Sequence, residues 1–106
     1  MSNLVKMIRL NNLEYNPNRD PQVYRRPVGE LFRIQVWLEG SGSAKGTFEV
    51  DGETKCEKSV NLPGKFDCQV SFDEAGTQLG TLTIEANGET VTRSVRLDVE
   101  EHAKVG

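Results

Sequence analysis

Hydrophobic and polar residues alternate along most of this chain with a period of two. In ELFRIQVWLEG, residues 30–40, every second residue is apolar: Phe32, Ile34, Val36 and Leu38. Because successive side chains of a strand point to opposite faces, this set should pack inward and Trp37 should lie on the other face. Long runs with the helical period are missing, so the pattern predicts an all-β fold.

Two dipeptides predict tight hairpins. Asp51-Gly52 separates the alternating runs of GTFEVDGETK, and Asn87-Gly88 does the same in TLTIEANGETVTRSVRLDV. Asp, Asn and Gly tolerate the positive φ angles that a type I′ turn requires. The apolar residues after the second turn share one face: Val91, Val95, Leu97 and Val99. They predict one long final strand, and residues 4–10 predict a first one.

Two Gly-containing segments predict further turns. GSGSAKG, residues 40–46, predicts a flexible turn, and NLPG, residues 61–64, predicts a hairpin between strands at 54–60 and 65–72. If that hairpin is centred on Leu62, Cys56 faces Cys68 at a separation of about 5.5 Å, which suits a disulfide. A slip of one residue would place the two cysteines on opposite faces.

The two cysteines leave four interpretations open. A structural disulfide fits the spacing best. Two reduced, buried thiols would also suit this apolar strand, because free cysteine packs as a small hydrophobe. A redox-active pair lacks the CxxC arrangement at a helix start that lowers a thiol pKa. A metal site would need more ligands than two thiolates and His102 supply, so no metal is expected.

Residues 11–29 hold three of the four prolines and predict a long loop with, at most, a short edge strand near Val23. Aromatic and arginine side chains are enriched at binding hot spots, and long loops on rigid β-scaffolds often carry recognition. The candidate binding residues are therefore Tyr15, Arg19, Tyr24, Arg25, Arg26 and Trp37. The alternative is that this loop crosses the fold, its tyrosines cover an edge, and the loop also covers Trp37.

Length and charge limit the classes of protein that fit. A chain of 106 residues predicts one domain, 1–106, with residues 100–106 as a disordered tail. No apolar run approaches the roughly 20 residues of a membrane span. The net charge is −3, and no basic stripe is concentrated anywhere, so nucleic-acid binding is not expected.

Catalytic signatures are missing from the sequence. It contains no GxSxG, P-loop, GxGxxG or HExxH motif, and a single histidine offers little for acid–base chemistry. Asp73-Glu74 lack the alternating oxygen ligands of an EF-hand, although a loop calcium site stays open as an alternative. We expect neither an enzyme nor a cofactor.

The order of signals between Gly29 and Val99 resembles a bacterial immunoglobulin-like domain of the cell-adhesion-related type. The segments that carry the resemblance are FRIQVWL, FEVDGETK, KSVNLPG, FDCQVSF and GTLTIEANGETVTRSVRLDV. Fibronectin type III domains are similar in the same way. Antibody-type domains differ, because Trp37 is not flanked by cysteines on the expected strands. The resemblance implies an antiparallel immunoglobulin-like β-sandwich of about seven strands.

Three functions follow as hypotheses. The first is a non-catalytic interaction or structural module of a larger bacterial surface or secreted protein, which contacts a protein partner. The second is a carbohydrate- or small-ligand-binding sandwich that uses Trp37 and the 15–26 loop. The third is a small redox or metal-handling protein that acts through its two cysteines. A bridged pair would place the domain outside the cell, on its surface or in a periplasm, and reduced thiols would place it in the cytoplasm.

Overall fold

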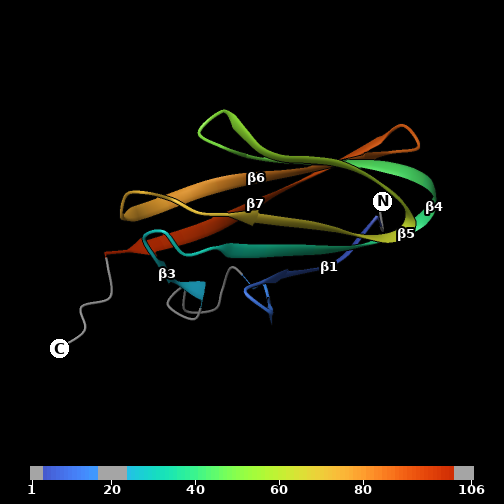
Figure 1. The fold of residues 1–106 in the computed structure, drawn as a ribbon. Coiled ribbons are helices and arrows are strands. Elements are labelled where there is room, and N and C mark those ends of the chain that lie inside the picture. Colours follow the sequence, from blue (N-terminus) through green and yellow to red (C-terminus); the bar gives the residue numbers. More distant parts are fainter. Residues whose placement is uncertain (1–3, 17–23, 102–106) are drawn as a thin grey trace.

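The computed structural model describes residues 4–16 and 24–101, and it is all-β (Figure 1). These residues form seven strands and no α-helix. The strands are β1 (Val5–Leu10), β2 (Leu13–Glu14), β3 (Arg26–Pro27), β4 (Phe32–Val50), β5 (Glu53–Val70), β6 (Gly76–Ala86) and β7 (Glu89–Glu100). The predicted all-β class is therefore confirmed. Val23 lies outside the described residues, as does the tail beyond Glu101.

The strands form one curled, mixed sheet that resembles half of a barrel (Figure 1). Its order is β2-β1-β4-β6-β7-β3, and β5 pairs with β4 along the remaining edge. Every pair is antiparallel except β3 and β7, where Arg26 lies beside Val99 in a parallel register. The prediction of a purely antiparallel arrangement is wrong at this pair, because residues 24–27 enter the sheet in the same direction as the final strand.

The predicted turns at 40–46 and 61–64 are wrong, because the chain does not reverse its direction at either segment. Both segments lie inside long strands and opposite each other, since Gly42 pairs with Leu62 and Leu38 pairs with Gly64. The β4–β5 register shifts between these pairs, and Gly42 has a φ of 88°. This is a conformation that glycine adopts without a steric cost. The glycines therefore bend a continuous hairpin instead of ending it, and Figure 1 shows β4 and β5 curving together.

The bend brings the two halves of the hairpin face to face around the core. On the other edge of β4, its first half pairs with β1 and its second half with β6. The Phe66 ring from one half packs directly over Gly46 in the other, where a Cβ atom would overlap the ring. The apolar set predicted to face inward does so, and each member is at most 2% exposed: Phe32, Ile34, Val36 and Leu38.

The two tight hairpins are confirmed. Asp51 and Gly52 join β4 to β5 with φ angles of 53° and 77°, and Asn87 and Gly88 join β6 to β7 with 52° and 78°. Positive φ at both central residues is the signature of a type I′ turn. These turns fix the register of the flanking strands, which runs without a shift along the whole β6–β7 pair.

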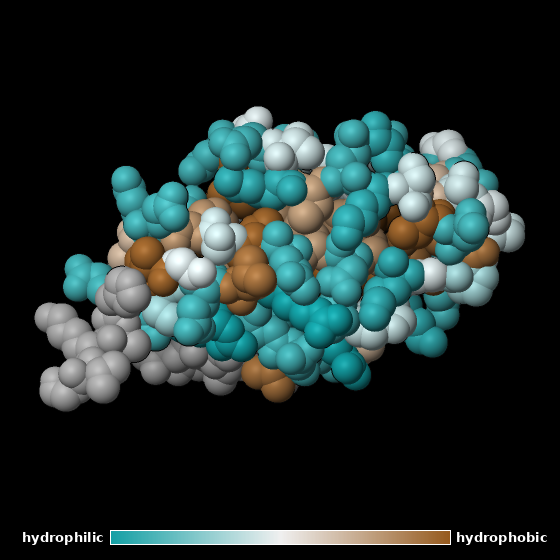
Figure 2. Space-filling view, in the orientation of Figure 1, coloured by the Kyte–Doolittle hydropathy of each residue, from teal (hydrophilic) through white to brown (hydrophobic). Residues whose placement is uncertain are grey.

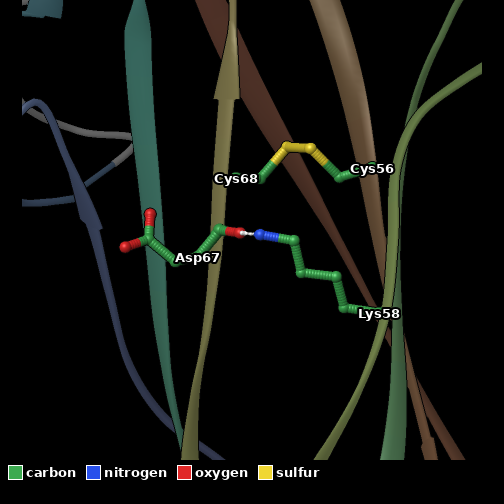
Figure 3. Close-up of a disulfide and its surroundings, with 4 residues drawn as sticks. All are labelled: Cys56, Lys58, Asp67 and Cys68. Atoms are coloured by element: carbon green, nitrogen blue, oxygen red, sulfur yellow. Dashed lines mark hydrogen bonds between the residues drawn. A yellow bond between two sulfur atoms is a disulfide. The ribbon is translucent and has the colours of Figure 1, made fainter.

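A disulfide between Cys56 and Cys68 holds the bend closed along the β5 edge (Figure 3). The two Cα atoms are 6.0 Å apart, and Cys68 is buried. The predicted bond is confirmed, but the predicted hairpin is wrong: both cysteines belong to β5, where Cys56 pairs with Phe48 and Cys68 with Ile34. They meet because β5 folds back on itself, so the disulfide joins the two halves of one bent strand.

Candidate functional site

Tyr24, a predicted binding residue, is part of the core. Its ring is 3% exposed, and its hydroxyl donates to the Glu14 carbonyl at 2.6 Å and accepts from the Asn16 amide at 2.9 Å. The buried Asn11 side chain donates to the Tyr24 carbonyl at 2.7 Å and accepts from the Arg33 amide at 2.9 Å. Tyr24 is therefore a structural anchor that fixes the loop to the β1–β2 turn.

Tyr15 links the same loop to the far side of the sheet. Its ring lies 5.4 Å from that of Tyr24, and its hydroxyl accepts from the Arg96 amide of β7 at 3.0 Å. Tyr15 thus connects the segment after β2 to the backbone of β7. Tyr24 is buried and Tyr15 is half-buried, and both rings take part in packing, as expected if the tyrosines cover an edge.

The three arginines of the loop do not form a common site. Arg26 pairs with Val99 in β3, and its guanidinium donates to the Arg25 carbonyl at 3.1 Å. Arg25 lies 4.0 Å from a Glu100 oxygen, and its side chain is partly exposed. Arg19 lies outside the described residues. The structure therefore uses Arg26 to attach the loop to β7 and gives Arg25 only a loose surface ion pair.

Trp37 occupies a different surface, the outer face of the first half of β4. It pairs with Met7 of β1 on one side and with Lys65 of β5 on the other. The Arg9 guanidinium carbon is 5.1 Å from the centre of its ring, and the Lys65 Nζ is 5.6 Å away. Both cations are within range for a cation–π interaction. The half-buried indole is thus flanked by these neighbours, and part of the 11–29 loop that was expected to cover it, residues 17–23, lies outside the described residues.

Some cations of this face have carboxylate partners, whereas Arg9 and Lys65 beside the ring have none among the described residues. Lys6 lies 3.5 Å from Glu39, and Arg33 lies 3.4 Å from Asp67. Within the described part of the chain, neither Arg9 nor Lys65 has a carboxylate within 4.0 Å. Beside them is an open hollow of about 430 Å³. Its lining residues are Lys6, Trp37, Leu38, Glu39, Pro63, Gly64 and Lys65.

We call the group formed by Arg9, Trp37 and Lys65, with the adjoining hollow, the Trp37 surface. It combines an apolar ring with two positive charges that have no carboxylate counter-ion among residues 4–16 and 24–101. Such a surface favours a ligand that carries negative charge, because Arg9 and Lys65 are both exposed and can be reached by a carboxylate from outside. On the face shown in Figure 2, polar side chains divide the apolar surface into separate patches, so that face offers no continuous apolar contact area.

Sequence reasoning found Trp37 but missed Arg9 and Lys65. The alternation Val5, Met7, Arg9 places Arg9 on one face of its strand, yet nothing in the sequence shows that β1 lies beside β4. The interpretation of residues 61–64 as a turn gives no reason to place Lys65 beside Trp37, although the two pair across β4 and β5. One general rule points to Arg9 and Lys65: a tryptophan on the outer face of a strand is usually covered by long side chains from the neighbouring strands.

The described residues do not assemble a metal site. No group of three or more His, Cys, Asp or Glu side chains lies close enough together to hold an ion in residues 4–16 and 24–101. The same residues contain no helix that is long and apolar enough to cross a membrane. Cys56 and Cys68 are bonded to each other, so the structure contains a disulfide rather than two reduced thiols.

The comparisons with known proteins do not assign the chain to a family. No family model matches it, and no curated protein sequence is significantly similar to it.

Proposed function

We propose that this chain is a non-catalytic interaction module that contacts an acidic segment of a protein partner through the Trp37 surface. One observation carries the proposal: two cations flank a half-buried tryptophan, and neither has a carboxylate partner in the part of the chain that the structure describes. Tryptophan and arginine are the residues most enriched at binding hot spots. A carboxylate of the partner would supply the missing counter-ions.

The scaffold beneath this surface supports a binding role. The side chains of the Trp37 surface stand on three paired strands, β1, β4 and β5, rather than on a loop. The disulfide and the Phe66–Gly46 contact hold β4 and β5 behind it. Sites on rigid elements lose little conformational entropy when they bind.

A neutral sugar is the alternative ligand. Sugars stack on an open aromatic face, and here Arg9 and Lys65 lie against the indole ring from both neighbouring strands. The predicted sugar site also needed Trp37 and the 15–26 loop together, whereas Tyr15 and Tyr24 are engaged with each other and with the sheet. These contacts favour the acidic protein partner.

The disulfide also supports a place for the module in an oxidising compartment. Such bonds persist outside the cell, on its surface or in a periplasm, and are rare in the cytoplasm. We extend the proposal to a module of a larger surface or secreted protein, related to immunoglobulin-like domains. The support for that relation is the face-to-face packing of the two halves of the sheet. Its long continuous β4 and β5 distinguish it from two separate sheets.

Titration of the single tryptophan tests the proposal. The intrinsic fluorescence of Trp37 should change saturably with a short Glu/Ser-rich peptide and not with a Lys/Ser-rich one. The Arg9→Gln/Lys65→Gln variant should bind the acidic peptide about tenfold more weakly, since two favourable charge contacts are lost. A matched control, Lys45→Gln/Lys55→Gln, removes the same net charge elsewhere and should bind normally.

Two outcomes would count against the proposal. If neutral oligosaccharides change the fluorescence and the acidic peptide does not, the carbohydrate alternative replaces it. If the acidic peptide binds both double variants equally well, the interaction reflects net charge rather than the Trp37 surface. High salt should weaken genuine binding, because the contacts at this exposed face are screened.

A further inference from the structure

Two long strands at edges of the sheet, β5 and β7, differ in how they are protected. An unpaired edge is a template for a further strand, and proteins block it with lysine, proline, bends or covering segments. The β5 edge carries these protections: Pro63 lies at its bend, and the Lys58 Nζ donates to the Asp67 carbonyl at 2.6 Å (Figure 3). The disulfide further ties its two halves together.

The β7 edge has free backbone groups whose direction can be derived. The Arg96 amide donates to the Tyr15 hydroxyl, and the Glu100 carbonyl accepts from Val28, so these residues point away from β6. The β6–β7 register has no shift, and backbone groups alternate in direction along an antiparallel strand. The N–H and C=O groups of Thr90, Thr92 and Ser94 therefore point outward as well.

This part of β7, Glu89–Val95, lacks the protection that β5 has. In the described part of the chain, β3 pairs only with Val99 and Glu100, and Tyr15 reaches only Arg96. The segment contains no proline and no lysine. Its one capping contact is weak, the Arg93 guanidinium to the Thr92 carbonyl at 3.2 Å. Among the described residues, this part of β7 is thus an open edge, whereas the β5 edge is blocked.

We propose that the Glu89–Val95 edge of β7 pairs antiparallel with the same edge of a second copy of this chain, centred on Val91. In this register Thr90 lies opposite Thr92 of the other copy, and Glu89 lies opposite its Arg93. Each contact occurs twice by symmetry. Both Glu89 and Arg93 are exposed, and no ion pair joins either of them to another described residue. The edge thus supplies its own complementary charges.

The direction of the backbone groups selects this register. Outward-pointing residues must face one another to exchange hydrogen bonds, so even-numbered residues pair with even-numbered ones. A pair centred on Arg93 would oppose two arginines, and one centred on Thr92 would place Arg93 opposite Val91. Centring on Val91 matches opposite charges and sets threonine against threonine, both of which favour cross-strand pairing.

Sedimentation equilibrium of the full chain over a wide concentration range tests the proposal. The wild-type protein should form a weak, reversible dimer. Arg93→Glu or Glu89→Arg alone should weaken association about tenfold, because two attractive pairs become repulsive. The combined Glu89→Arg/Arg93→Glu variant restores both pairs and should dimerise as the wild type does, which a folding defect could not imitate.

A backbone variant tests the hydrogen bonds separately. Thr92→Pro removes an amide that points outward and spares the β6–β7 ladder, so it should abolish the dimer, whereas Thr92→Val keeps the amide and should not. Hydrogen exchange at the Thr90 and Thr92 amides should slow as concentration rises. A wild-type chain that stays monomeric throughout, or a dimer that ignores both the charge reversal and Thr92→Pro, would overturn the proposal.

Discussion

Removing the Cys56–Cys68 disulfide should lower the free energy of unfolding by about 3 kcal/mol. The bonded residues are 12 apart in sequence, and the chain-entropy estimate for closing a loop of this size gives about that value at 25 °C. A domain of this size has a total stability of only about 5–15 kcal/mol. The bond therefore supplies a large part of the margin that keeps the bent hairpin folded.

Urea denaturation of the Cys56→Ala/Cys68→Ala variant measures this loss, with the reduced wild-type protein as the control. The two should agree, because both lack the bond while the control keeps the sulfur atoms in the core. In a thermal melt, about 3 kcal/mol corresponds to a midpoint lower by roughly 12–24 °C. A loss below about 1 kcal/mol in both proteins would refute the reasoning, because the β4–β5 contacts alone would then hold the bend.

Three further predictions follow from the packing. Gly46→Ala should lower the free energy of unfolding measured in urea by about 1–3 kcal/mol, because its Cβ would overlap the Phe66 ring. Adding Phe66→Leu to the same chain should reduce the cost of the Gly46→Ala change. An unchanged urea midpoint for Gly46→Ala would contradict the close approach. Tyr24→Phe should cost about 1–3 kcal/mol in a thermal melt, more than Tyr15→Phe, since it removes two part-buried hydrogen bonds to the backbone. Equal effects would argue against the anchoring role of Tyr24. Asn11→Ala should lower the free energy of unfolding by about 2–4 kcal/mol in calorimetry, because it removes two side-chain hydrogen bonds from a residue whose backbone has a φ of 55°. Asn11→Gly should lose less stability, because glycine adopts this positive φ without a steric cost. An equal loss in both variants would show that φ contributes little.

The local signals of the sequence predicted local structure well. Alternation identified the buried face of the first half of β4, and the dipeptides Asp51-Gly52 and Asn87-Gly88 are the hairpin turns. These features depend on a few neighbouring residues, whose allowed φ angles and side-chain directions are fixed by local sterics. They required no knowledge of what lies across the sheet.

The bend of the β4–β5 hairpin could not be predicted in the same way. Glycine and proline at 40–42 and 63–64 show that the chain departs from a regular strand, but they do not distinguish a reversal from a bend. That choice depends on contacts between distant segments, here Phe66 over Gly46 and the disulfide. The cysteine pairing was thus predicted correctly from a hairpin geometry that does not exist.

The candidate site was predicted only in part for the same reason. Tyr15 and Tyr24 have the composition of a binding loop, yet their hydroxyls are used to tie that loop to β2 and β7. Trp37 was identified from strand parity alone. Its cationic neighbours come from two other strands, so the Trp37 surface exists only once β1, β4 and β5 are side by side.

The most direct test of the proposed function is chemical-shift mapping of the labelled protein with the Glu/Ser-rich peptide. The proposal predicts that the Trp37 indole signal and the amides of Arg9 and Lys65 move together and saturably, while those of Tyr15 and Tyr24 stay in place. Shifts centred on the Tyr15–Tyr24 loop, or none at any peptide concentration, would contradict it.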